Sequence, residues 1–351
     1  MKLVWLVVTG ALYLGPGVGS ALGQAVDTDS LRRAQRAEIE RYHAQAAAAA
    51  AVFLDRTRTP AERLAAVREI PGFVEPQQVD GCVAIALNQA EPIAVRVRAL
   101  QLVGPRVDAD TSVAQRVFVI ATDTTAPAEL RSEAVTQLAL ASFALPQSFL
   151  RPLRAAARDP DIRIRRTALR ALAGHGDPPS LDMLAAGLSS PTEALLPPSE
   201  AVQLLGLKDP APFYPLLHRL MLQPPDSATR LVAIQLLGRY GPSRGTIALF
   251  LRDSKEAPAV RQAALGALAA GDPRGLPQQV LPVVADEAAP LDLRLRAIKA
   301  VEVARTSRDP KVFARAPDEF DRLLERLAER SPSLAVREAA RTYLSRTRSA
   351  R

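Results

Sequence analysis

PDIRIRRTALRALAG, which spans residues 160–174, carries the pattern that decides the fold. Within it, Ala168 is followed by Leu169 one residue later and by Leu172 four residues later. These three positions lie on one side of a helix with 3.6 residues per turn. The stretch therefore predicts a helix with one buried face, on which the small alanine lets a neighbouring helix approach closely.

The same pattern recurs along most of the chain. Successive alanines are separated by 31 to 35 residues, except for a last interval of 43 residues. Four residues after the alanine (position +4) the residue is always apolar, and one residue after it (position +1) only Arg341 breaks the aliphatic rule. The alanines are Ala66, Ala99, Ala134, Ala168, Ala201, Ala233, Ala264, Ala297 and Ala340. A period in this range is typical of a solenoid of stacked helical pairs.

A second series of apolar segments lies between these helices and supplies the other helix of each pair. The segments span residues 80–89, 113–121, 147–157, 180–188, 213–222, 244–252, 276–284 and 312–327. Each is followed by a turn-rich stretch, and no sustained alternation with β-branched residues indicates strands. The order helix, turn, helix, turn is therefore predicted along the array.

An arginine stands three residues before the alanine in eight of the nine units, and a proline usually stands just upstream. Proline suits the first turn of a helix, whereas a cation near a helix N-terminus is unfavourable. We interpret the arginines as an internal ladder that is satisfied by acids or carbonyl groups of adjacent turns; the alternative is a basic binding stripe. The ladder consists of Arg63, Arg96, Arg131, Arg165, Arg230, Arg261, Arg294 and Arg337. The candidate acids are Glu91, Glu129, Asp159, Asp272 and Asp309.

Two units depart from the pattern. The unit at Ala201 has Pro198 in place of the arginine. It is interpreted as a degenerate unit with a longer turn, and the alternative is a bend or contact point in the middle of the array. The long last interval predicts an extended helix near Asp318–Arg330 that acts as an end cap.

The pattern Pro–x–x–Val–Arg–x–x–Ala–aliphatic–x–x–Leu resembles the short bacterial HEAT-like repeat, which is also found in phycobilisome lyases. It is carried by PIAVRVRALQLVG at 92–104, PAVRQAALGALAAGDP at 258–273 and PLDLRLRAIKAV at 290–301, in addition to the stretch quoted first. The resemblance implies an all-α fold, a right-handed superhelical α-solenoid of about nine HEAT-like helix pairs over residues 59–348. It implies little about activity, because such repeats serve scaffolds, adaptors and lyase-like proteins alike.

The N-terminus has the features of an export signal. Lys2 is followed by an apolar run from Leu3 to Leu14 and then by small residues, which predicts a secretory signal peptide over residues 1–25; an uncleaved membrane anchor is the alternative. Residues 26–58, with an alanine tract at 46–51, are predicted to form an N-terminal helical cap. We therefore expect a periplasmic or secreted protein without stable membrane insertion after cleavage.

Sequence motifs for catalysis are missing. The three histidines, His43, His175 and His218, are far apart, and Cys82 is the single cysteine and is expected to be a small core residue. We find no metal-ligand spacing, nucleophile motif or phosphate-binding glycine loop in the sequence, so we expect no enzyme activity, cofactor or metal. The net charge is +8, but an exported chain meets little nucleic acid, and none is expected as a partner.

The favoured function is a non-catalytic exported scaffold or adaptor that binds a protein or peptide on the concave face of the solenoid. The alternatives are an envelope protein that binds anionic polysaccharide or lipid through arginines, and a lyase- or hydrolase-associated subunit. The positions immediately before the alanine (−1) and two residues after it (+2) point away from the buried stripe, and they are expected to bind the partner. The predicted contact residues are Arg98, Gln101, Arg170, Gln203, Val232, Gln235, Ala263, Arg296 and Lys299.

Overall fold

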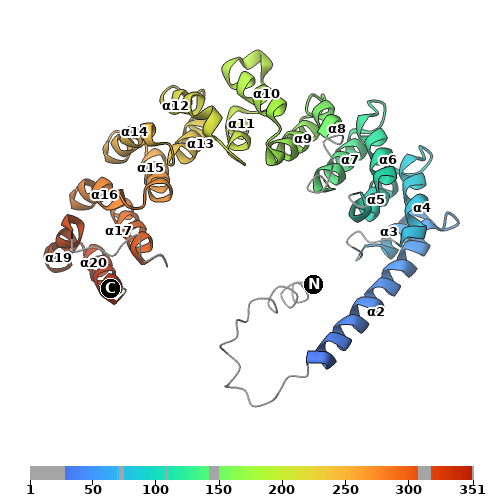
Figure 1. Cartoon of the computed structure of the whole chain (residues 1–351), viewed down its shortest axis with the longest axis horizontal. Coiled ribbons are helices and arrows are strands. Elements are labelled where there is room, and N and C mark those ends of the chain that lie inside the picture. Colours follow the sequence, from blue (N-terminus) through green and yellow to red (C-terminus); the bar gives the residue numbers. More distant parts are fainter. Residues whose placement is uncertain are drawn as a thin grey trace. The chain divides into compact units, whose positions relative to one another are not determined.

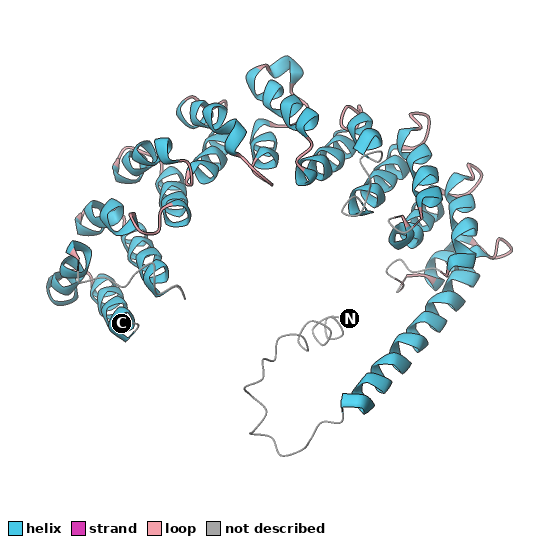
Figure 2. Ribbon diagram, in the orientation of Figure 1, coloured by secondary structure: helices cyan, strands magenta, loops and turns pink. Residues whose placement is uncertain are grey.

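The computed structural model describes residues 28–68, 70, 75–107, 110–141, 150–306 and 318–349. All regular elements in these ranges are helices (Figure 2). The predicted signal peptide at residues 1–25 lies outside the described residues. The chain divides into two compact units, Met1–Pro105 and Arg106–Arg351.

The helices come in pairs, as the repeat predicts, and the described residues form nine such pairs (Figure 1). We call the earlier member of each pair the first helix and the alanine-centred member the second helix. The first helices are α2 (Thr28–Leu54), α4 (Pro76–Leu87), α6 (Thr111–Thr122), α8 (Leu150–Ala156), α10 (Pro178–Ser189), α12 (Tyr214–Leu222), α14 (Gly241–Arg252), α16 (Leu276–Ala285) and α19 (Glu319–Arg330). The second helices are α3 (Pro60–Ala66), α5 (Ile93–Val103), α7 (Ala128–Ala141), α9 (Ile162–His175), α11 (Pro198–Leu205), α13 (Ser227–Leu237), α15 (Pro258–Gly271), α17 (Leu291–Thr306) and α20 (Leu334–Ser349). This arrangement is an all-α solenoid, and the right-handed superhelix stays a prediction.

In the first unit, α2 packs against α3 and α4 and so takes the place of a first helix. Its C-terminal part buries Ala46, Ala50 and Phe53, which have no exposed surface. The side chains of residues 32–45 are exposed on every side of the helix. Only the second half of α2 therefore contributes to the core of this unit.

In the second unit, consecutive second helices pack on one another from α7 through α20. In every repeat from Ala99 to Ala297, the repeated alanine and the aliphatic residue directly after it are buried, which confirms the predicted buried stripe. The two helix C-termini of α13 and α15 meet at Gly238 and Gly271, whose backbones are too close to leave room for a side chain between them. Small residues thus set the distance between neighbouring second helices.

The end of the array differs from the expectation. The helix near Asp318–Arg330 is α19, which has 12 residues and equals α14 in length, so it is not extended. The longer last interval arises partly because α17 runs over 16 residues, to Thr306. The remaining length falls in residues 307–317, outside the described residues.

Candidate functional site

The ladder arginines reach across their own helix pair to the end of the first helix. In five units the arginine Nε donates to the carbonyl oxygen of the penultimate residue of that helix. These bonds join Arg63 to Phe53 (2.7 Å), Arg96 to Ala86 (2.9 Å), Arg230 to Met221 (3.2 Å), Arg261 to Leu251 (3.0 Å) and Arg294 to Val284 (3.1 Å).

This geometry resolves the apparent conflict with the helix dipole. The last four carbonyl groups of a helix have no partner within that helix, and the negative end of the dipole favours a cation there. Each arginine begins near the N-terminus of the second helix but places its guanidinium at the C-terminus of the first helix. Arg63, Arg96, Arg261 and Arg294 are buried in this position.

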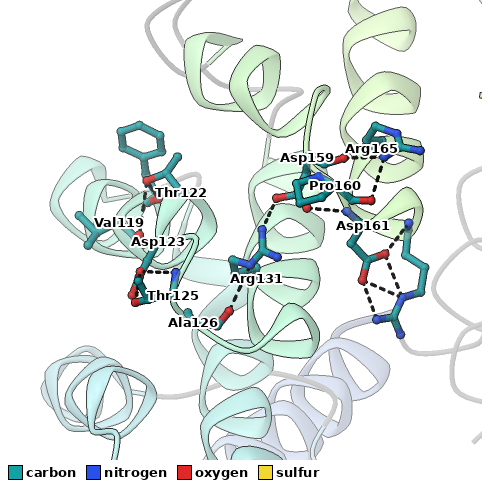
Figure 3. A network of polar contacts seen from close by, with 12 residues as sticks. Val119, Thr122, Asp123, Thr125, Ala126, Arg131, Asp159, Pro160, Asp161 and Arg165 are labelled. Atoms are coloured by element: carbon teal, nitrogen blue, oxygen red, sulfur yellow. Dashed lines mark hydrogen bonds and ion pairs between the residues drawn. The ribbon is translucent and has the colours of Figure 1, made fainter. Parts of the chain in front are cut away.

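Three ladder arginines also bind an acid of the next repeat. Arg63 donates to Glu91 (2.8 Å), Arg230 makes two bonds to Glu256 (2.7 and 2.9 Å), and Arg131 is paired with Asp159. Figure 3 shows the Arg131 guanidinium between Asp159 and the carbonyl oxygen of Ala126, to which its Nε donates (3.2 Å). Each acid stands in the turn before the following second helix, so these ion pairs link one repeat to the next.

The acids that the sequence suggested divide into two groups. Glu91 and Asp159 bind ladder arginines. Asp272 instead accepts hydrogen bonds from the backbone N–H of Gly275 in its own turn and from the Gln279 amide of α16. The Glu129 side chain is exposed, and Asp309 lies outside the described residues. Glu256 was missed, although it stands five residues before the ladder arginine Arg261, as Glu91 stands five residues before Arg96, and this shared position could have identified it.

Two ladder arginines bind other carbonyl groups. Arg165 donates to the carbonyl oxygens of Asp159 (2.7 Å) and Leu195 (3.0 Å), and Arg337 donates to that of Ser331 (2.5 Å). Arg165 therefore bridges to the turn before α11, in the unit whose own ladder position is Pro198.

The predicted partner-binding residues differ in exposure. At position +2, the side chains of Arg170, Gln203, Gln235 and Lys299 are exposed, and Gly266 in the same position is exposed as well. At position −1, Arg296 is exposed, Val232 is half-buried and Ala263 is buried, with 9% of its surface exposed. The exposed face of the second helices is therefore centred on position +2.

The prediction that Ala263 is an exposed contact residue is wrong. Ala263 belongs to the hydrophobic core of the second unit, so position −1 is not exposed in every repeat. Arg98, in the same position of its repeat, donates to the carbonyl oxygens of Val67 and Ile70 at the end of α3 and to Gln101 (3.1 Å). Arg98 and Gln101 are thus engaged within the first unit.

Glu200, also at position −1, is bound by Arg166 of the preceding second helix through two hydrogen bonds (2.6 and 2.9 Å). The Arg166 guanidinium holds the pKa of the Glu200 carboxyl below its usual range. The Arg163 guanidinium acts in the same way on Asp161, the N-cap of α9, and lowers the pKa of Asp161 to about 2. The acids near α9 are therefore ionised and already neutralised by arginines.

An open groove lies between the first helices α10 and α12, next to the unit that lacks a ladder arginine. Its lining includes Ala185, Ser189, Phe213, Leu216 and Arg219, and Arg219 donates to the Ser189 hydroxyl (3.0 Å). The other side chains of the lining are apolar, and Ser189 and Arg219 are its polar side chains. Arg219 is the one ionisable residue in the lining, so the groove presents no pair of groups for acid–base chemistry.

Residues with reactive side chains are dispersed among the described helices. Nδ1 of His218 is hydrogen-bonded to the Ser243 hydroxyl (2.7 Å), and burial raises the pKa of the Cys82 thiol to about 12. A search of the described residues finds no group of three or more His, Cys, Asp or Glu side chains that could hold a metal ion. In the same part of the chain, none of the helices combines the length and the hydrophobicity that a membrane crossing requires.

Residues 115–196 match a family model described as HEAT repeats. The chain contains HEAT repeats. This match covers α7 to α10 and parts of the flanking elements, and the helix pairs on either side repeat the same arrangement.

Two solved structures are similar to this HEAT-like protein. One is the complex of CpcE and CpcF of phycocyanin lyase from Nostoc sp. PCC7120, with 16% identity, a TM-score of 0.37, and coverage of 78% of this chain and 94% of that chain. The other is human deoxyhypusine hydroxylase in complex with glycerol, with 16% identity, a TM-score of 0.32, and coverage of 86% and 95%. No curated protein matches the sequence.

Proposed function

We propose that this HEAT-like protein is a non-catalytic scaffold that binds a protein or peptide partner along the exposed face of the second helices α9 to α17. The observation that supports this most directly is the row of +2 residues. Gln203, Gln235 and Gly266 are exposed and uncharged in three consecutive repeats, and Arg170 and Lys299 flank them. Such a surface can be covered by a partner with little cost of removing charge from water.

The proposal is tested by photo-crosslinking in the cells that make the protein. A photoreactive amino acid at position 203 or 235 is expected to yield a discrete crosslinked partner, because these side chains would lie inside the contact. The matched control places the same amino acid at Leu249 of α14, which is 63% exposed but belongs to the first helices. Equal crosslinking from all three positions, or none from positions 203 and 235, contradicts the proposal.

We also propose that the protein is exported to the periplasm or beyond the cell. The support is the charged start, apolar run and small-residue exit of residues 1–25. The mature protein recovered from the periplasmic or secreted fraction is expected to begin at Val26, or at Gln24 if cleavage follows Gly23. N-terminal sequencing of the recovered protein checks this, and an intact Met1 would contradict cleavage.

A second candidate function is binding of an anionic polysaccharide or lipid surface. The exposed side chains of Arg170 and Arg296 on the same face favour it. Arginine contacts to a polyanion weaken steeply as ionic strength rises, whereas an uncharged contact changes little. The salt dependence of binding therefore separates the two candidates.

A further inference from the structure

The acids on the exposed face of α9 to α17 are all engaged by neighbouring side chains in the described structure. Glu200 is bound by Arg166, and Asp292 accepts from the Gln262 amide (3.1 Å). Glu302, near the end of α17, is buried and accepts from both Lys299 (2.7 Å) and Arg346 (2.6 Å). Glu200 and Glu302 are therefore each paired with a cation, whereas Asp292 is bound by a neutral amide.

Three exposed arginines of these repeats have no such partner. Arg170 in α9, Arg239 just after α13, and Arg296 in α17 are exposed, and within the described residues they make no side-chain hydrogen bond or ion pair. Arg170 is near enough to Glu200 to contribute to its lowered pKa, but Arg166 already occupies both oxygens of that carboxylate. The three arginines therefore make no direct ion pair within the described residues.

The three arginines recur in alternate repeats. They belong to the repeats of α9, α13 and α17, and the repeats of α11 and α15 between them present Gln203 and Gly266 (Figure 1). Packed helices lie about 8–10 Å apart, so two repeats span about 16–20 Å. An extended chain covers this distance with about five or six residues.

The neutral positions between the cations also suit a polypeptide. The Gln203 and Gln235 amides each offer a donor and an acceptor, which is the combination that a peptide group needs. A nucleic acid, by contrast, carries a charge about every 1.7 Å along a duplex and would leave most of its phosphates opposite neutral residues here. The spacing therefore favours sparse carboxylates on a polypeptide over a dense polyanion.

We infer that the partner is an acidic peptide segment, which lies extended across α9 to α17 and carries carboxylates about six residues apart that pair with Arg170, Arg239 and Arg296. This inference rests on the proposed function, because it uses the same face. The Gln203 and Gln235 amides bind the backbone of the segment between its acids. Exposed ion pairs are weak one by one, so affinity comes from their spacing together with the contacts between them.

The test uses the full-length mature protein and two fluorescent probe peptides of about 15 residues with the same composition. One probe carries three glutamates separated by about five neutral residues each, and the other carries the three glutamates in a row. The spaced probe is expected to bind about tenfold more tightly in fluorescence anisotropy, because only it can reach all three arginines. Equal affinity for the two probes would overturn the inference, since it would indicate unspecific attraction to a basic protein.

Two triple variants complete the test. Arg170→Gln with Arg239→Gln and Arg296→Gln is expected to remove the preference for the spaced probe. The control, Arg322→Gln with Arg326→Gln and Arg330→Gln, makes the same change in net charge on three exposed positions of the first helix α19 and is expected to keep the preference. An equal loss in both variants, or tighter binding of heparin or polyphosphate than of the spaced probe, would contradict the inference. Crosslinks from positions 203 and 235 to a partner without such acids would overturn this inference while leaving the proposed function in place.

Discussion

Replacing Gly271 by alanine is expected to destabilise the protein, whereas the same replacement at Gly266 in the same helix is expected to stabilise it. A Cβ atom on Gly271 would overlap the carbonyl oxygen of Gly238 at the end of α13. A Cβ atom on Gly266 would meet no atom within 4 Å, and this residue is exposed in the interior of α15. The two variants therefore make the same substitution, and they differ chiefly in the space around the new methyl group, although Gly271 is also the last residue of α15.

The expected magnitudes follow from these surroundings. Overpacking against backbone costs about 1–3 kcal/mol, because the neighbouring helix must shift as a whole. At Gly266, alanine adds about 0.5–1 kcal/mol, because glycine loses more conformational entropy than alanine when a helix forms. Urea denaturation followed by circular dichroism measures both free energies of unfolding. A Gly271→Ala protein as stable as the unchanged protein would mean that α13 and α15 do not meet at these backbones.

The close contact of α13 and α15 also shows what the sequence could and could not predict. The repeat of alanine with aliphatic residues at +1 and +4 predicts the buried stripe, because the phase of a helix relative to its own core depends only on its periodicity. It does not predict how closely the next helix lies. The periodicity therefore places Ala263 on the exposed face, although the residue is buried.

The arginine ladder shows the same limit. The unfavourable position of a cation near a helix N-terminus predicts that something must compensate for it. The compensating group is in most cases a carbonyl at the end of the first helix, and every residue has a carbonyl, so no residue type marks it. Glu256 and Asp159 are identifiable because they are acids in a repeated position, whereas Met221 and Leu251 carry no comparable signal.

The largest effect of a single side chain is expected at Arg131. Its guanidinium and the Asp159 carboxylate are each only 7% exposed, and they pair across the boundary between the repeats of α7 and α9. Arg131→Met keeps the apolar stem but leaves Asp159 buried opposite no cation. Breaking a buried ion pair from one side costs about 3–5 kcal/mol, because the remaining charge stays desolvated without its partner.

The matched control is Arg163→Met in the first turn of α9. Arg163 pairs with Asp161 at 2.7 Å, but its side chain is 63% exposed. An exposed pair contributes little to stability, so this variant is expected to unfold at nearly the same urea concentration as the unchanged protein. Both variants lose one arginine and one ion pair, but the pair of Arg131 is buried, and Arg131 also loses its hydrogen bond to the carbonyl oxygen of Ala126. Equal destabilisation by Arg131→Met and Arg163→Met would contradict a buried link at Asp159.

A double-mutant cycle separates the lost attraction from the buried charge. Asp159→Asn removes the charge but retains a side-chain oxygen, which can still accept from the backbone N–H of Asp161. The double variant Arg131→Met with Asp159→Asn is therefore expected to lose less stability than the sum of the two single variants, with a coupling of about 1–3 kcal/mol. Hydrogen exchange of the α7 and α9 amides locates the effect, because in a repeat protein stability is carried by the interface between neighbouring repeats. Faster exchange confined to these two helices is expected for Arg131→Met, since the pair joins their repeats directly.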